Sequence, residues 1–89
     1  RYIQKLEAEG YAHVYEWQDP AGKIYPTHAH KGKTSIMVTD GSAVVEIAGE
    51  RKEVTALQRL DIPADTPHSV TVGPGGWIVI IGEEFADDA

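Results

Sequence analysis

The apolar positions of this chain change their spacing at Gly10. Before it, Tyr2, Ile3 and Leu6 share one face of a helix, and the glycine stands where a helix commonly ends. From Tyr11 onward, short segments rich in β-branched and aromatic residues alternate with turn residues. The pattern predicts a short N-terminal helix followed by an all-β region.

Eight strands are predicted in that region, separated by turn sequences that include TDGS and GPGG. The pairs Asp40-Gly41 and Gly49-Glu50 suit tight hairpins, and GPGG at 73–76 is interpreted as a further turn. Many short strands at this spacing indicate a sandwich or a closed barrel, and residues 1–89 are expected to form a single domain. The predicted strands are Ala12–Trp17, Lys23–His30, Thr34–Thr39, Ala43–Ala48, Arg51–Thr55, Arg59–Ile62, His68–Val72 and Trp77–Gly82.

Strand alternation directs two neighbouring histidines toward the core. Because side chains two residues apart share a face, His28 and His30 should lie with Ile24 and Pro26, while Tyr25 points away. Their Cα atoms are then about 6.6 Å apart, close enough for two imidazoles to reach one ion. Two such histidines can also be exposed or hydrogen-bonded separately, so the spacing alone leaves both interpretations open.

A third histidine favours a metal site. His68 begins a late strand and shares its inward parity with Val70, and an earlier strand places Thr34 and Ile36 on its own inward parity. Several buried imidazoles without a metal would each need a separate polar partner. The predicted metal ligands are His28, His30 and His68, and the predicted pocket residues are Thr34, Ile36 and Val70.

The spacing around the first two histidines resembles the first motif of the cupin superfamily, G-x5-H-x-H-x3-E-x6-G. Gly22, His28, His30 and Gly41 occupy its positions, and Thr34 stands where the motif has glutamate.

The second cupin motif, G-x5-P-x-G-x2-H-x3-N, is matched at Pro63 and His68. Its remaining positions hold Leu57, Asp65 and Val72. Asp65 replaces a glycine with a residue that tolerates the left-handed backbone conformation better than most. The two motifs and their spacer cover more than half of the chain.

The resemblance implies a small cupin barrel (a double-stranded β-helix, or jelly roll), often dimeric, with a divalent metal near its mouth. By position, His28, His30 and His68 would be the ligands; three-histidine iron sites occur within the superfamily, in some thiol and diketone dioxygenases. With Thr34 in place of the glutamate, the site should carry no protein negative charge and should keep coordination positions open. Such a donor set suits Fe, Zn, Ni or Cu better than Mn.

Composition argues against several classes of function. The chain has no cysteine, so it forms no disulfide and offers no thiolate ligand, and a cytoplasmic location is expected. The net charge of −6 argues against a nucleic-acid-binding surface. The longest apolar run, Trp77–Ile81, is far shorter than the ~20 residues of a membrane span, so no membrane partner is expected.

Two classes of function fit these observations. The first is a metal-dependent enzyme, oxygenase-like or isomerase-like, acting on a small polar molecule; the second is a non-enzymatic module that binds or senses a small molecule in the same pocket. The fold alone does not choose between them. A homodimer is also expected, because so small a chain exposes strand edges and aromatic surface; the predicted contact includes Tyr11, Tyr15 and Trp17.

Overall fold

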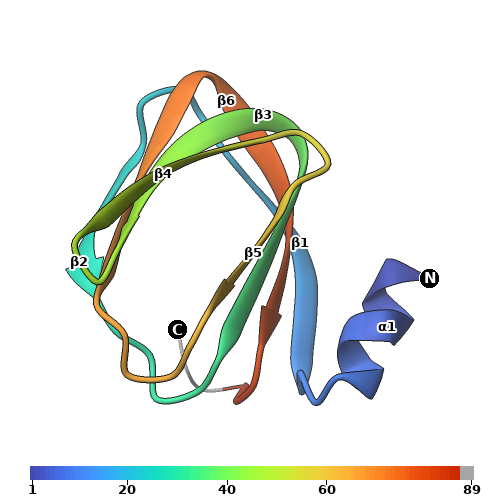
Figure 1. The fold of residues 1–89 in the computed structure, drawn as a ribbon. Helices are drawn as coiled ribbons and strands as arrows, with labels where there is room; N and C mark the ends of the chain where they lie inside the picture. The colour runs from blue at the N-terminus through green and yellow to red at the C-terminus, as the bar shows by residue number, and fades with distance from the viewer. Residues whose placement is uncertain (87–89) are drawn as a thin grey trace.

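A computed structural model gives the fold and describes residues 1–86. It confirms the short N-terminal helix and the mainly antiparallel β-structure that follows (Figure 1). Of the residues that the structure places, none lies in a helix with the length and hydropathy needed to span a membrane. The elements are α1 (Tyr2–Ala8), β1 (His13–Asp19), β2 (Ile24–His28), β3 (Thr34–Ile47), β4 (Glu50–Thr55), β5 (Arg59–Ile62) and β6 (His68–Glu83).

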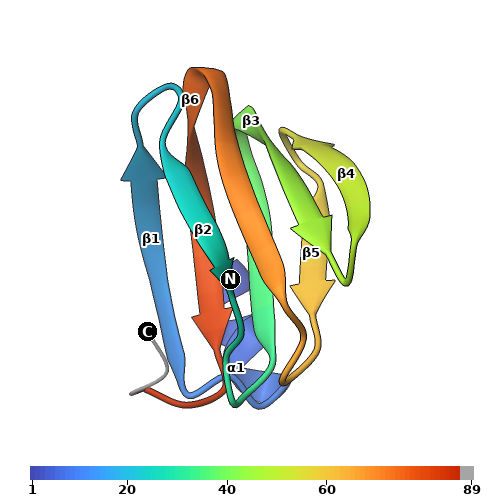
Figure 2. The ribbon, with the colours of Figure 1, turned by 90° about the vertical axis from the view of Figure 1, so that its left-hand side faces the viewer.

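Two long, bent strands organise the fold. Residues 34–38 of β3 pair with residues 79–83 of β6, and residues 43–47 pair with residues 68–72. β1 and β5 flank the first of these ladders, whereas β2 and β4 flank the second. β3 and β6 therefore arch over the top of the molecule in Figure 1 and join two half-sheets, and Figure 2 shows β2, β6, β3 and β4 side by side. Among residues 1–86, no strand pairing closes the sheet into a barrel.

The eight predicted strands become six because two predicted turns are wrong. The chain does not reverse at Asp40-Gly41 or at residues 73–76; it bends there and continues as β3 and β6. Gly41 has a φ of 84°, and a Cβ atom on it would overlap the carbonyl oxygen of Gly76. The glycines thus mark the point where two bent strands approach each other closely, which is another common reason for glycine in a strand.

A tight hairpin forms where Gly49-Glu50 predicted one, but its turn lies one residue earlier, and Glu50 already belongs to β4. Ile47 pairs with Glu50, so Ala48 and Gly49 form a two-residue turn, with φ angles of 50° and 82°. Positive φ at both central positions is the signature of the turn that best matches strand twist.

The predicted faces of β2 are wrong before His28, and His28 itself lines the cavity but remains exposed. Tyr25 pairs with Val70 and His28 with His68, so three residues of β2 span two residues of β6, as in a β-bulge. The extra residue reverses the alternation: Ile24 is 63% exposed, while Tyr25 packs against the core. β2 also ends at His28, which leaves the other histidine of the pair in the following loop.

The core lies between the inner faces of the two half-sheets. The predicted inward parities of β3 and β6 are confirmed, because Ile36, Val38, Val45, Val70 and Val72 are all buried. The remaining buried residues of this cluster are Ala43, Val54, Leu60, Ile62, Trp77 and Val79.

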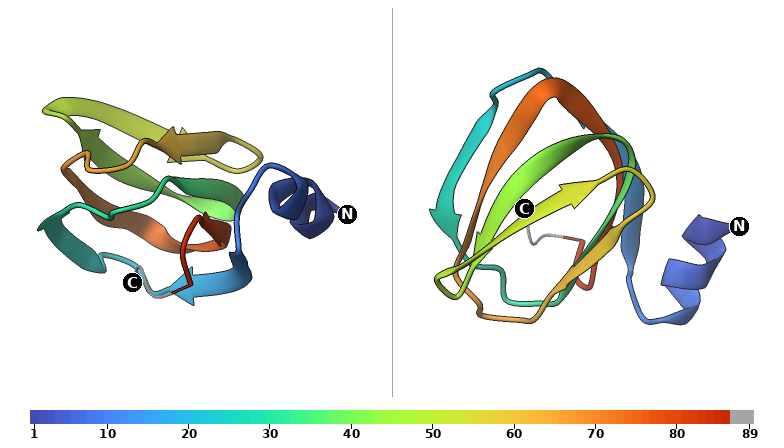
Figure 3. Two further views of the ribbon diagram at one scale, coloured as in Figure 1. Left: turned by 90° about the horizontal axis from the view of Figure 1, so that it is seen from below. Right: turned by 45° about the horizontal axis from the view of Figure 1, so that its top comes forward.

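Helix α1 covers part of the outer face of the sheet, close to β1 (Figure 3). It ends at Ala8, and Gly10 just beyond it has a φ of 97°, so that the amides of Gly10 and Tyr11 donate to the carbonyls of Glu7 and Leu6. Leu6 and Tyr11 are buried, and both lie against Gly82 of β6. Tyr11 therefore packs beneath the helix and is not available for the predicted dimer contact.

Candidate metal centre

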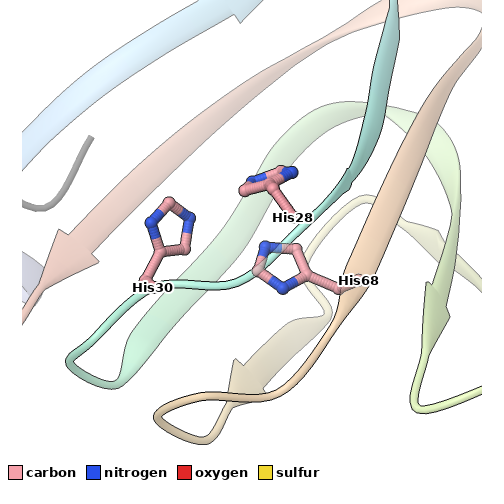
Figure 4. A group of neighbouring side chains, drawn as sticks. All are labelled: His28, His30 and His68. Atoms are coloured by element: carbon pink, nitrogen blue, oxygen red, sulfur yellow. The ribbon is translucent and has the colours of Figure 1, made fainter.

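Three histidines from different parts of the chain converge at one end of the core. His28 ends β2, His30 lies in the loop that follows, and His68 begins β6. Their side chains turn toward one another (Figure 4), and their candidate ligand atoms all lie within 4.8 Å of one another. His28 and His68 are brought together by direct cross-strand pairing, with ring centroids 4.3 Å apart.

Backbone carbonyls orient two of the three imidazoles. Nδ1 of His28 lies 2.7 Å from the carbonyl oxygen of Pro26, and Nδ1 of His68 lies 2.9 Å from that of Thr66. A carbonyl can only accept, so each Nδ1 carries the proton and donates it. Each Nε2 then keeps a free lone pair, which is how metal-binding histidines are commonly held.

Burial favours the neutral, ligating form of His68. The side chain is only 4% exposed, and loss of hydration lowers its pKa below that of an ordinary histidine. The neighbouring His28 and His30 lower this pKa further, while the hydrogen bond to Thr66 opposes the shift.

The donor set fits a divalent transition metal. Nitrogens bound to one ion at about 2.1 Å lie at most about 4.2 Å apart. The observed limit of 4.8 Å therefore requires only a small contraction of the cluster. Three neutral imidazoles suit Zn, Cu, Fe or Ni, and they leave positions for water or a ligand.

A cavity of about 180 Å³ extends from the histidines between the two half-sheets. Its wall includes the three sequence-predicted pocket residues, Thr34, Ile36 and Val70, as well as all three histidines. Six further residues, which the sequence analysis did not assign to the pocket, complete the lining: Trp17, Asp19, Tyr25, Trp77, Ile81 and Glu83.

Asp19 holds together the aromatic part of this lining. Its Oδ1 accepts hydrogen bonds from Tyr25 (2.7 Å) and Trp17 (3.1 Å), and its Oδ2 accepts one from Trp77 (2.9 Å). Three donors satisfy most of the acceptor capacity of one carboxylate. Asp19 is thus a structural acid that fixes the aromatic wall.

Glu83 is the second acid of the cavity and lies outside the compact cluster of the three histidines, which itself contains no carboxylate. It is 7% exposed, and its Oε2 accepts a hydrogen bond of 3.1 Å from the hydroxyl of Tyr15. Burial, together with the adjacent Glu83 carboxylate, raises the pKa of Tyr15 well above its usual range. The alternation Trp77, Val79, Ile81 predicts an inward residue at 83, but the predicted strand stopped one residue earlier.

Comparison with known proteins supports the fold. No protein-family model matches the sequence, and no curated protein matches it. Solved structures do match. An RmlC-like cupin from Shewanella frigidimarina superposes with a TM-score of 0.74 and 23% identity, over 83% of this chain and 67% of that one. The chain has the cupin fold.

Two enzymes with this cupin fold are also similar in structure. The DMSP lyase of Ruegeria pomeroyi has a TM-score of 0.74 and 19% identity, over 82% of this chain and 38% of that one. The salicylate 1,2-dioxygenase of Pseudaminobacter salicylatoxidans has a TM-score of 0.74 and 18% identity, over 80% of this chain and 20% of that one. The chain thus spans only part of the length of each enzyme, and identities this low concern the fold alone.

Proposed function

We propose that this cupin binds a divalent transition metal through His28, His30 and His68 and acts as an oxygenase-like or isomerase-like enzyme on a small molecule. The observation that carries the proposal is the histidine cluster: the backbone orients His28 and His68, and the candidate ligand atoms of these two residues and His30 all lie within 4.8 Å of one another. The bent half-sheets correspond in this proposal to the jelly-roll barrel of the cupins.

The cavity limits the size and the character of the ligand. A cavity of about 150 Å³ is known to accommodate benzene, so one of about 180 Å³ suits a molecule near the size of a substituted ring. When bound, the metal would supply Lewis-acid or redox chemistry at the histidine end. Trp17, Tyr25 and Trp77 would hold the apolar part of the ligand and keep water away from it.

We also propose a homodimer formed through β1. Among the described residues β1 pairs only with β6, so its other edge is unpaired, and Trp17 on this strand is 49% exposed. Light scattering should give twice the chain mass at micromolar concentration. A monomer mass would contradict this part of the proposal.

Metal analysis of protein purified without a histidine tag tests the main proposal. We expect close to one equivalent of a transition metal per chain, or stoichiometric binding by the metal-free protein in titration calorimetry. Oxygen consumption by the iron-loaded protein is then screened with thiols, diketones and phenolic acids. Turnover supports an enzyme, binding without turnover favours a small-molecule sensor, and absence of metal binding contradicts the proposal.

A further inference from the structure

We infer that Glu83, on β6, is the acidic partner of the metal centre. It would replace the glutamate that the cupin motif has at the position of Thr34, on the neighbouring strand β3. The inference rests on the proposed metal site. A chain with Thr34 at the motif position would in this way keep a carboxylate in the same cavity.

Strand register brings the two positions together. Thr34 and Glu83 are direct cross-strand partners in the antiparallel pairing of β3 with β6. Residues so placed have Cβ atoms about 4.5–5.5 Å apart and project from the same face of the sheet. Both are buried, with exposures of 6% and 7%, and both line the cavity that contains the three histidines. A carboxylate at 83 is thus displaced from the motif position by about one strand spacing.

The carboxyl group of Glu83 has no basic partner among the described residues of the cavity wall. Among residues 1–86, no lysine or arginine lines the cavity, and the one hydrogen bond found to the Glu83 carboxylate comes from the neutral Tyr15 hydroxyl. Burying a carboxylate is costly unless a positive charge or several donors compensate. The contrast with Asp19, which accepts three hydrogen bonds, singles out Glu83 as the acid with unused acceptor capacity.

Glu83 is not a member of the compact ligand cluster, which consists of the three histidines. We therefore place it beside the three ligands, where its carboxylate would offset the charge of a bound ion and accept a hydrogen bond from a water or ligand group on the open side. Tyr15 fixes one carboxylate oxygen and leaves the other for this contact. Partners of this kind commonly contribute 10–100-fold to metal affinity.

The test compares Glu83→Gln with Glu46→Gln. Glutamine keeps the acceptor for Tyr15 and removes the charge, whereas Glu46 lies on β3 with an exposed side chain and serves as the matched control. Calorimetric titration of the metal-free proteins with Zn²⁺ and Mn²⁺ should show at least about tenfold weaker binding for Glu83→Gln, with the larger loss for Mn²⁺. Glu46→Gln should bind as the wild type does.

Two further measurements separate a metal-directed charge from a structural one. Without metal, Glu83→Gln should melt at the same temperature as the wild type or higher, because it removes an uncompensated buried charge. The double substitution Thr34→Glu with Glu83→Thr, which moves the carboxylate to the neighbouring strand, should regain most of the lost affinity.

Equal metal affinity in Glu83→Gln and wild type would overturn the inference while leaving the histidine site intact. A lower melting temperature of metal-free Glu83→Gln would also overturn it, because Glu83 would then be a structural group. If the wild type itself binds no metal, that result contradicts the proposed metal site, and with it the role of Glu83.

Discussion

Where β3 pairs with β6, both faces of the sheet are buried, but the inner face borders a cavity and the outer face is covered by a helix. On the inner face, the paired Thr34 and Glu83 border a cavity. On the outer face, the next pair, Ser35 and Gly82, is closed by helix α1, whose Leu6 packs on the glycine. A shift of one residue along either strand therefore exchanges a ligand-facing position for a packing position.

The sheet thus keeps its binding positions apart from the positions that stabilise the fold. The inner face leaves polar groups with spare hydrogen-bonding capacity, which is costly for folding but useful to a ligand. The outer face is packed tightly enough that Leu6 has no exposed surface. Changes at the polar positions that border the cavity should alter metal binding and leave folding nearly unchanged, whereas changes under the helix should do the reverse.

The largest effect is expected for His68→Gln on the inner side. Losing one of three imidazole ligands should weaken Zn²⁺ binding at least about 100-fold, while the fold persists. His13→Gln is the control, because His13 is exposed on β1 and does not line the cavity. Calorimetric titration measures both variants. Similar affinities would show that His68 is not a ligand.

Leu6→Ala tests the outer side. Leu6 is fully buried, so its truncation should lower the free energy of unfolding by about 3 kcal/mol, the sum of lost burial and a cavity. Ile3→Ala, on the same helix but 43% exposed, should cost less than about 0.5 kcal/mol. Urea denaturation compares them. Metal affinity should stay the same in both, and a large change in Leu6→Ala would show that the two faces are coupled.

The inner face was only partly predictable from the sequence. The motif spacing placed His28, His30 and His68 on inward positions, and the structure brings them together. The side chains of β2 do not follow simple alternation, because a bulge reverses the faces of Ile24 and Tyr25. A bulge depends on pairing with a distant strand, so local periodicity does not reveal it.

The backbone signals of the cupin motifs were more reliable than the strand ends. Asp65 has the positive φ, 56°, expected of a residue that replaces glycine, and Leu57 also adopts a positive φ, 71°, at a motif glycine position. The bends at Gly41 and residues 73–76 were mistaken for turns, because glycine serves a reversal and a close strand approach equally well. Ending the last strand at Gly82 excluded Glu83 from the predicted pocket.

Acidification should weaken binding on the inner side. Metal ligands must be neutral imidazoles, so affinity should be constant well above the ordinary histidine pKa of about 6.5 and fall below it. Burial lowers the pKa of His68, which keeps this histidine in its neutral, ligating form to lower pH than an ordinary histidine. We expect at least a tenfold loss of Zn²⁺ affinity between about pH 7 and 5.5 by calorimetric titration. Unchanged affinity across this range would indicate other ligands.

The smallest effect is expected beneath the helix, at Ser35. Its side chain is fully buried, and its hydroxyl has no hydrogen-bond partner among the described residues. Removing an unsatisfied buried hydroxyl relieves a desolvation cost, so Ser35→Ala should raise the free energy of unfolding by about 1 kcal/mol in urea denaturation. Ser69→Ala, on the partly exposed outer side of β6, should change it by less than about 0.5 kcal/mol. Destabilisation by Ser35→Ala would show instead that the hydroxyl stabilises the packing under α1. Metal affinity should not change, because the side chain of Ser35 points away from the cavity that its neighbour Thr34 lines.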